Sequence, residues 1–114
     1  ARDEKDLDFD LAPFGVIGLQ TLLPAVHRLH REHGIPFSEL LARITVNPAR
    51  VLGIDGGSLS PGSRADVVLF DPQARWVFTQ EQVLSKSANS PFLGCEFTGR
   101  VVRTIVQGRT VYRL

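Results

Sequence analysis

The fold is decided by the stretch Asp8-Phe9-Asp10-Leu11-Ala12-Pro13-Phe14-Gly15-Val16-Ile17-Gly18-Leu19, in which a charged opening gives way to an apolar loop that leads into a helix. The side chains from Leu11 to Ile17 carry no charge and no hydrogen-bonding group, so this loop makes polar contacts only through its backbone. Gly15 and Gly18 let other groups approach the main chain closely. The residues alone leave two interpretations open: the floor of a ligand site, and a buried loop that precedes a helix.

Composition narrows the class of protein. The chain has 114 residues, of which 43% are hydrophobic and 22% charged, an ordinary globular balance for one modest domain. Thirteen basic and twelve acidic residues give a net charge of +1, which predicts neither a nucleic-acid nor a membrane partner. No apolar run approaches a membrane span, and the charged opening does not resemble a secretion signal. With Cys95 as the single cysteine, we expect a cytoplasmic location.

Residues 18–33 predict a helix with one buried apolar stripe. The stripe consists of residues at helical spacing, namely Leu19, Leu22, Leu23, Val26 and Leu29. Pro24 is tolerated only in the first turn, so the regular helix is expected to begin near Leu22. Gly34 is placed to end it.

Two shorter helices are expected next. Ser38 is the predicted N-cap of a helix that runs through Ile44, with Glu39 in its first turn. A third helix follows, with Asn47 as N-cap, Pro48 at the first helical position and Gly53 just past the end.

His27, His30 and His33 form the histidine cluster of the sequence. Their spacing places neighbours on one helix face, so a metal site has to be considered. Because Arg28 and Arg31 are interleaved with them, the surroundings repel a cation. We therefore predict a solvated helix face and no metal site.

From Gly56 onward glycine, serine and proline punctuate short β-branched runs, which predicts turns and strands. Ser60-Pro61-Gly62 suits a type II turn. Residues 65–71 predict a strand buried on both faces, and residues 75–79 a second strand with Trp76 and Phe78 on one side. Residues 100–114 predict a β-hairpin that turns at Gln107-Gly108. Asp66, at a strand start, is interpreted as a structural hydrogen-bonding residue rather than a catalytic carboxylate.

Residues 85–94 are polar, carry a proline and show no regular period, so they predict a loop. Lys86 and Asn89 could bind a ligand there. We prefer a surface connection, because the apolar residues of the same segment can hold the loop against the domain.

Several of these segments resemble class I dihydroorotases of the cyclic-amidohydrolase superfamily. Residues 10–21 resemble the segment that follows the last catalytic aspartate in that family, and residues 1–5 its short charged loop. Asn47-Pro48-Ala49 and residues 61–68 resemble superfamily motifs found after the barrel. The pattern of residues 85–94 is closer to dihydroorotases than to allantoinases or dihydropyrimidinases. The chain thus resembles the C-terminal quarter of such an enzyme.

The resemblance implies an α/β fold in two parts. Residues 1–55 would form the last loop and helices of a metal-dependent (β/α)8 TIM barrel, and residues 56–114 would supply strands of a small composite β-sandwich. It also implies a zinc-dependent hydrolase that interconverts N-carbamoyl-L-aspartate and L-dihydroorotate in pyrimidine biosynthesis. Phe14 and Gly15 would contact the substrate. The zinc ligands and catalytic residues would lie outside this segment, which is expected to be inactive alone.

Partners follow from the same resemblance. The first is the remainder of the same protein, without which the hairpin strands would leave unpaired edges, so the segment is expected to fold poorly alone. A homo-oligomer and a complex with aspartate carbamoyltransferase are further possibilities. Two alternatives stay open: an inactive homologue that serves as an assembly partner of aspartate carbamoyltransferase, and a related cyclic amidase such as allantoinase or hydantoinase.

Overall fold

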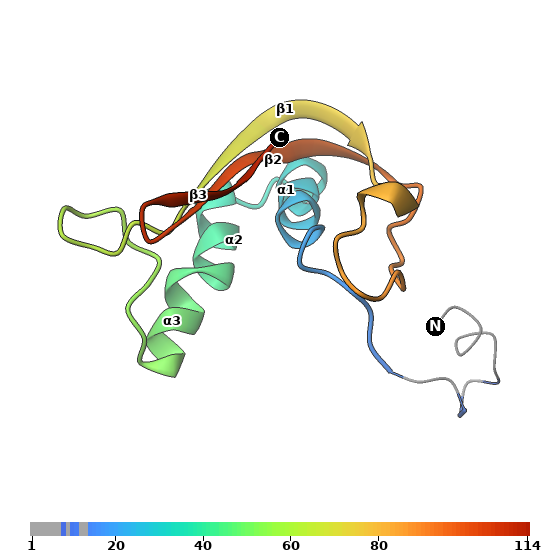
Figure 1. Cartoon of the computed structure of the whole chain (residues 1–114), viewed down its shortest axis with the longest axis horizontal. Coiled ribbons are helices and arrows are strands. Elements are labelled where there is room, and N and C mark those ends of the chain that lie inside the picture. Colours follow the sequence, from blue (N-terminus) through green and yellow to red (C-terminus); the bar gives the residue numbers. More distant parts are fainter. Residues whose placement is uncertain (1–7, 9, 12–13) are drawn as a thin grey trace.

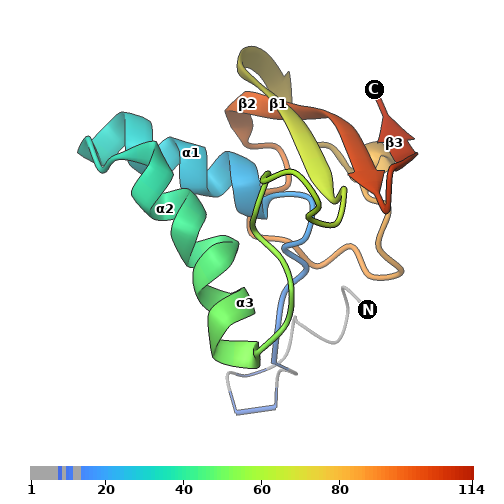
Figure 2. The same ribbon diagram turned by 90° about the vertical axis from the view of Figure 1, so that its left-hand side faces the viewer.

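A computed structural model describes residues 8, 10–11 and 14–114. The predicted charged loop at residues 1–5 therefore lies outside the described residues. The elements, in chain order, are α1 (Leu22–His33), α2 (Phe37–Ile44), α3 (Val46–Leu52), β1 (Val67–Val77), the short 3-10 helix η2 (Gln80–Gln82), β2 (Glu96–Val106) and β3 (Arg109–Arg113). The strands form an antiparallel sheet in the order β1-β2-β3. β1 and β2 arch over α1 (Figure 1), and the three helices lie on one side of the sheet (Figure 2).

Helix α1 confirms the predicted boundaries. It begins at Leu22, which places Pro24 in the first turn, where the missing N–H has no intrahelical acceptor to lose. Gly34 ends the helix in the left-handed conformation, with φ of 67°, and its N–H bonds to the carbonyl of His30.

The predicted starts of α2 and α3 are each wrong by two residues. Helix α2 begins at Phe37 with Pro36 in the cap position, so Ser38 lies inside the first turn. Helix α3 begins at Val46, so Asn47 and Pro48 occupy its second and third positions. Proline still fits there, since the first-turn N–H groups have no intrahelical acceptor. Gly53 ends α3 with φ of 64°, as predicted.

The two strands predicted between residues 65 and 79 are one strand, β1, with an interruption. Its register with β2 shifts between Asp71 and Arg75. Within that shift, the Asp71 carboxylate accepts the backbone N–H groups of Gln73 and Ala74 at 2.9 and 3.2 Å. A local turn stabilised by Asp71 thus bends the strand without ending it.

The C-terminal hairpin confirms its prediction. β2 and β3 pair across a turn at Gln107 and Gly108, whose φ angles are 49° and 78°. Two successive positive φ angles are those of a type I′ turn, whose twist matches that of the strands it joins. β2 is longer than expected and starts at Glu96.

Two ring clusters pack against the sheet, and the second of them joins it to α1 and α2. The first packs around Phe97 and contains Trp76, Phe78 and Phe92, with ring centroids between 5.5 and 6.0 Å apart in each contact. The second contains His27, His30, Phe37 and Phe70. Phe78 and Phe97 are each only 1% exposed, so burial is concentrated in this narrow layer between α1 and the sheet.

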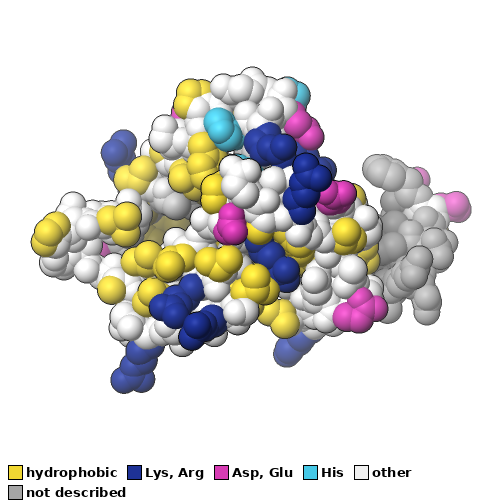
Figure 3. Space-filling view, turned by 90° about the horizontal axis from the view of Figure 1, so that it is seen from above, with side chains coloured by type: hydrophobic (Ala, Val, Ile, Leu, Met, Phe, Trp, Pro, Cys, Tyr) yellow, Lys and Arg dark blue, Asp and Glu magenta, His cyan; other side chains and the backbone are white. Residues whose placement is uncertain are grey.

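The predicted buried stripe of α1 is wrong for most of its members. Leu19 is 90% exposed, and Leu22 and Leu29 are also exposed, whereas Pro24, Val26 and His27 are buried. The prediction that residues 65–71 are buried on both faces is wrong as well, because Val68 and Leu69 are exposed. These apolar side chains have no cover within the described part of the chain. Viewed from above, exposed apolar groups lie among interspersed charges of both signs (Figure 3).

Candidate functional site

The candidate site is the pair Phe14 and Gly15, at the start of the segment that we call the leading loop, residues 14–21. Phe14 is fully exposed, and Gly15 has a φ of 88°, a conformation that L side chains rarely adopt. Asp8 and Asp10, in the charged opening, are exposed. The loop therefore presents an aromatic ring and a glycine backbone at the surface of the segment, ahead of α1.

The leading loop is held by a second loop far along the chain. The side-chain amide of Asn89 donates a hydrogen bond to the carbonyl of Gly15 at 2.6 Å. The main-chain carbonyl of the same residue accepts the N–H of Ile17 at 2.9 Å. Asn89 thus fixes the backbone on both sides of Val16.

Gln20 makes a similar double contact further along the leading loop. Its side-chain amide donates to the carbonyl of Gln82 at 2.8 Å, and its side-chain oxygen accepts the N–H of Leu84 at 2.8 Å. The contacts of Gln20 join residues 62 and 64 positions apart, and that of Asn89 with Gly15 joins residues 74 positions apart, so the sequence did not predict them. The composition of residues 85–94 predicts a loop and their resemblance to dihydroorotases draws attention to it, but neither indicates which residues it contacts.

The Asn89 loop, residues 83–95, is itself anchored in the core. Ser87 and Ser90 accept the backbone N–H groups of Asn89 and Phe92 through their hydroxyls. The ring of Phe92 packs 5.5 Å from that of the buried Phe97. Lys86 is exposed, in keeping with the predicted surface connection, and Asn89 makes a structural contact with the leading loop from within that connection.

The histidines do not share one solvated face, which corrects the prediction. His27 is buried, and its Nδ1 lies 2.8 Å from the carbonyl oxygen of Thr98 on β2. His30 is half-buried, with its Nδ1 2.7 Å from the carbonyl oxygen of Ile35. Because a carbonyl oxygen only accepts, both Nδ1 atoms carry the proton. His33 alone is exposed.

Asp66 acts as a structural acceptor, as predicted. One carboxylate oxygen accepts the N–H of Gln107 at 2.8 Å, and the other pairs with Arg64. The bond from Gln107, supported by the charge of Arg64, holds the pKa of Asp66 below its ordinary value. The carboxylate thereby ties the start of β1 to the turn between β2 and β3.

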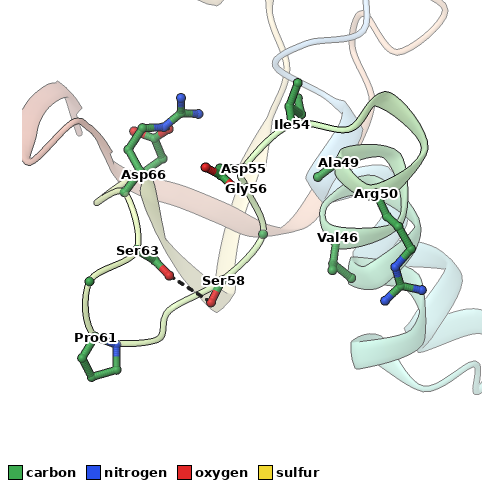
Figure 4. A pocket seen from close by; sticks show the side chains of 13 residues that line it. Val46, Ala49, Arg50, Ile54, Asp55, Gly56, Ser58, Pro61, Ser63 and Asp66 are labelled. Carbon is green, nitrogen blue, oxygen red and sulfur yellow. Dashed lines mark hydrogen bonds and ion pairs between the residues drawn. The ribbon is translucent and has the colours of Figure 1, made fainter.

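An open cavity of about 820 Å³ lies between α3 and the loop that follows it (Figure 4). Its charged lining residues are of both signs, Arg50 and Arg64 against Asp55 and Asp66. In its wall, Ser63 donates to the hydroxyl of Ser58 at 3.2 Å. Neither of the residues predicted to contact substrate lines it, so Phe14 and Gly15 remain the candidate site.

Most of the chain matches a known protein family. Residues 13–112 match the sequence profile described as the amidohydrolase family. The chain belongs to the amidohydrolase family. As a segment of an amidohydrolase, it includes the leading loop, the helices and all three strands within the match.

The similar relatives of this amidohydrolase segment are dihydroorotases. It is 45% identical over 111 residues to a dihydroorotase of Geotalea daltonii and 46% identical over 111 residues to one of Geobacter metallireducens. Each alignment covers 97% of this chain and 26% of the relative, so the chain spans about a quarter of the relatives' length. A solved D-hydantoinase superposes with a TM-score of 0.85 at 26% identity, covering 97% of this chain and 25% of that protein.

Proposed function

We propose that this chain is part of a dihydroorotase, which interconverts N-carbamoyl-L-aspartate and L-dihydroorotate in pyrimidine biosynthesis. The observation that carries the proposal is the 45–46% identity to dihydroorotases across 97% of the chain. The segment contributes a substrate loop and structural elements, and it is inactive without the remainder of the protein.

Within that enzyme, Phe14 and Gly15 contact the substrate through their main chain. The geometry supports this role, since Phe14 is fully exposed and residues 14–17 of the loop carry no polar side chain of their own. A glycine at φ of 88° leaves space beside the backbone, and a Cβ built at Gly15 meets no atom of the described chain within 4 Å. A polar ring such as dihydroorotate can therefore lie close to this peptide.

The proposal includes zinc, which would polarise the amide carbonyl and supply a hydroxide when bound. The described residues do not fit a metal: they contain no group of three or more His, Cys, Asp or Glu side chains able to hold one. We therefore assign the zinc ligands to other parts of the protein.

We also propose the architecture and partners of the whole enzyme. Residues 1–55 would complete a TIM barrel, and residues 56–114 a β-sandwich whose other strands come from the remainder of the protein. The exposed apolar side chains of α1 and β1 support this, because they need cover that the described residues do not give. The proposal further includes a cytoplasmic location and assembly as a homo-oligomer or with aspartate carbamoyltransferase. No helix in the described part of the chain has the length and apolar character needed to span a membrane.

The test is an assay of the full-length protein with L-dihydroorotate, N-carbamoyl-L-aspartate, hydantoin and allantoin. We expect the highest kcat/KM with the dihydroorotate pair, loss of activity on chelation, and recovery with zinc. The sequence upstream of Ala1 is a second check, since an Asp-His-Ala-Pro-His run there favours an active enzyme.

Two outcomes would replace the proposal. A preference for hydantoin would favour a hydantoinase, a candidate supported by the superposition on D-hydantoinase with a TM-score of 0.85. Inactivity with every substrate, together with stable binding to aspartate carbamoyltransferase, would favour an inactive assembly partner.

A further inference from the structure

The strongest unexplained feature of the molecule is the double contact of Asn89 with the leading loop. Its side chain reaches the carbonyl of Gly15, and its main chain reaches the N–H of Ile17. Asn89 therefore constrains the orientation of the peptide after Gly15. That peptide immediately follows the pair expected to contact substrate.

The contact between Asn89 and Gly15 holds the leading loop against an anchored part of the chain. The distance of 2.6 Å between Nδ2 of Asn89 and the carbonyl oxygen of Gly15 is short for a neutral N–H···O bond. On its other side, the Asn89 loop is fastened by the ring of Phe92 against the buried Phe97. Asn89 thus connects the backbone of Gly15 to a loop that is packed against the buried core.

The conformation of Gly15 explains why a support is needed. Glycine with φ of 88° has many other backbone conformations available, so an isolated loop would not keep this one. A hydrogen bond to its carbonyl restricts rotation of the peptide plane. An enzyme that binds substrate through such a peptide gains affinity from this preorganisation.

We propose that Asn89 is the positioning residue of the Phe14–Gly15 substrate contact. The inference rests on the proposed function, in that it assigns the substrate to this pair, and it adds a residue that acts through the backbone. Asn89 itself need not touch the substrate. The N–H donor of its side-chain amide makes the positioning contact, because the carbonyl of Gly15 can only accept a hydrogen bond.

The test compares two matched substitutions in the full-length protein. Asn89→Asp preserves shape but replaces the donor by a carboxylate that repels the Gly15 carbonyl. Gln20→Glu makes the same chemical change at the neighbouring contact, where the carbonyl of Gln82 is the acceptor. Both variants weaken the attachment of the two loops, but only the first disturbs Gly15.

With L-dihydroorotate as substrate, we expect Asn89→Asp to raise KM about tenfold with kcat within about twofold, since the lost contact holds substrate and transition state alike. Gln20→Glu should lower the melting temperature but leave KM within about twofold of wild type. An unchanged KM in Asn89→Asp, or equal increases in both variants, would overturn the proposal. Asn89→Ala serves in place of Asn89→Asp if the latter does not fold.

A second readout does not depend on activity. Hydrogen exchange of the Ile17 amide reports directly on the contact with the main chain of Asn89. We expect about tenfold faster exchange in Asn89→Asp and no change in Gln20→Glu. If the wild-type protein hydrolyses no cyclic amide, the proposed function fails, and exchange still decides whether Asn89 positions this loop. Unaltered exchange in Asn89→Asp would refute the inference in either case.

Discussion

Gly99 on β2 lies directly against His27 on α1, so closely that a Cβ built at Gly99 would come within 2.6 Å of His27 Nδ1. The same Cβ would clash still more closely with the ring of Phe70, and the φ of Gly99 is 100°. Glycine at this position thus lets the helix approach the sheet and lets His27 bond to the carbonyl of Thr98 at 2.8 Å.

Gly99→Ala should therefore destabilise the full-length protein by about 2–4 kcal/mol, because overpacking and an unfavourable φ act together. Thermal and urea unfolding would measure the loss. Gly34→Ala is the control, since Gly34 also has a positive φ but open space at its Cβ. It should cost about 1 kcal/mol. Equal losses in both variants would show that α1 can move away from the sheet at no cost.

The helices show what the sequence alone can predict. Pro24 and Gly34 fix the ends of α1, because the conformations of proline and glycine are local properties. The predictions that Ser38 and Asn47 cap α2 and α3 are wrong. The capping preference of a single residue stabilises a helix end too weakly to fix it against the conformation of the neighbouring turns. Thr45 illustrates this: its hydroxyl bonds back to the carbonyl of Leu41 at 2.6 Å instead of capping α3.

Burial and long-range contacts could not be predicted from the sequence, for a different reason. The periodicity of Leu19, Leu22 and Leu29 indicates an apolar helix face, but it does not say which part of the protein covers that face. His27 is buried only because Gly99, which is 72 positions away, leaves room for it. The bond from Asn89 to Gly15 is equally non-local, so no pattern within either loop could reveal it.

Acid should weaken the tie between β1 and the hairpin. The pKa of Asp66 is lowered mainly by the hydrogen bond from Gln107, so its ionised form stabilises the folded state above the unfolded pKa. That stabilisation is lost as the pH falls through the lower, folded pKa. In an NMR titration, the Gln107 amide shift should change with a midpoint below the ordinary aspartate value of about 3.9.

Asp66→Asn should abolish this titration of Gln107, whereas Asp55→Asn, at an exposed position on the preceding loop, should leave it unchanged. A midpoint at or above the ordinary aspartate value would contradict the role of the hydrogen bond.

The isolated segment should not form a stable monomer. Leu19, Leu84 and Val111 are 90%, 75% and 61% exposed, and an apolar groove of about 440 Å³ runs between the leading loop and the sheet. Such surfaces promote association unless another part of the protein covers them. We expect residues 1–114 alone to self-associate in sedimentation experiments, to bind a hydrophobic dye and to unfold without a cooperative transition. A monomer with a sharp urea transition would contradict this expectation.

The substrate role of the leading loop is tested by a pair of glycine substitutions. Gly15 and Gly53 both have positive φ, 88° and 64°, and a Cβ at either position meets nothing within 4 Å in the described chain. Gly15→Val and Gly53→Val therefore carry comparable backbone strain and differ chiefly in location. In the full-length enzyme, Gly15→Val should lower kcat/KM by about tenfold or more, at least about 1.4 kcal/mol of transition-state stabilisation, because the new side chain obstructs the approach of the ring. Gly53→Val should destabilise the end of α3 and leave the kinetics of the folded enzyme nearly unchanged. Equal kinetic effects, or a normal kcat/KM for Gly15→Val, would reduce the leading loop to a packed connection ahead of α1.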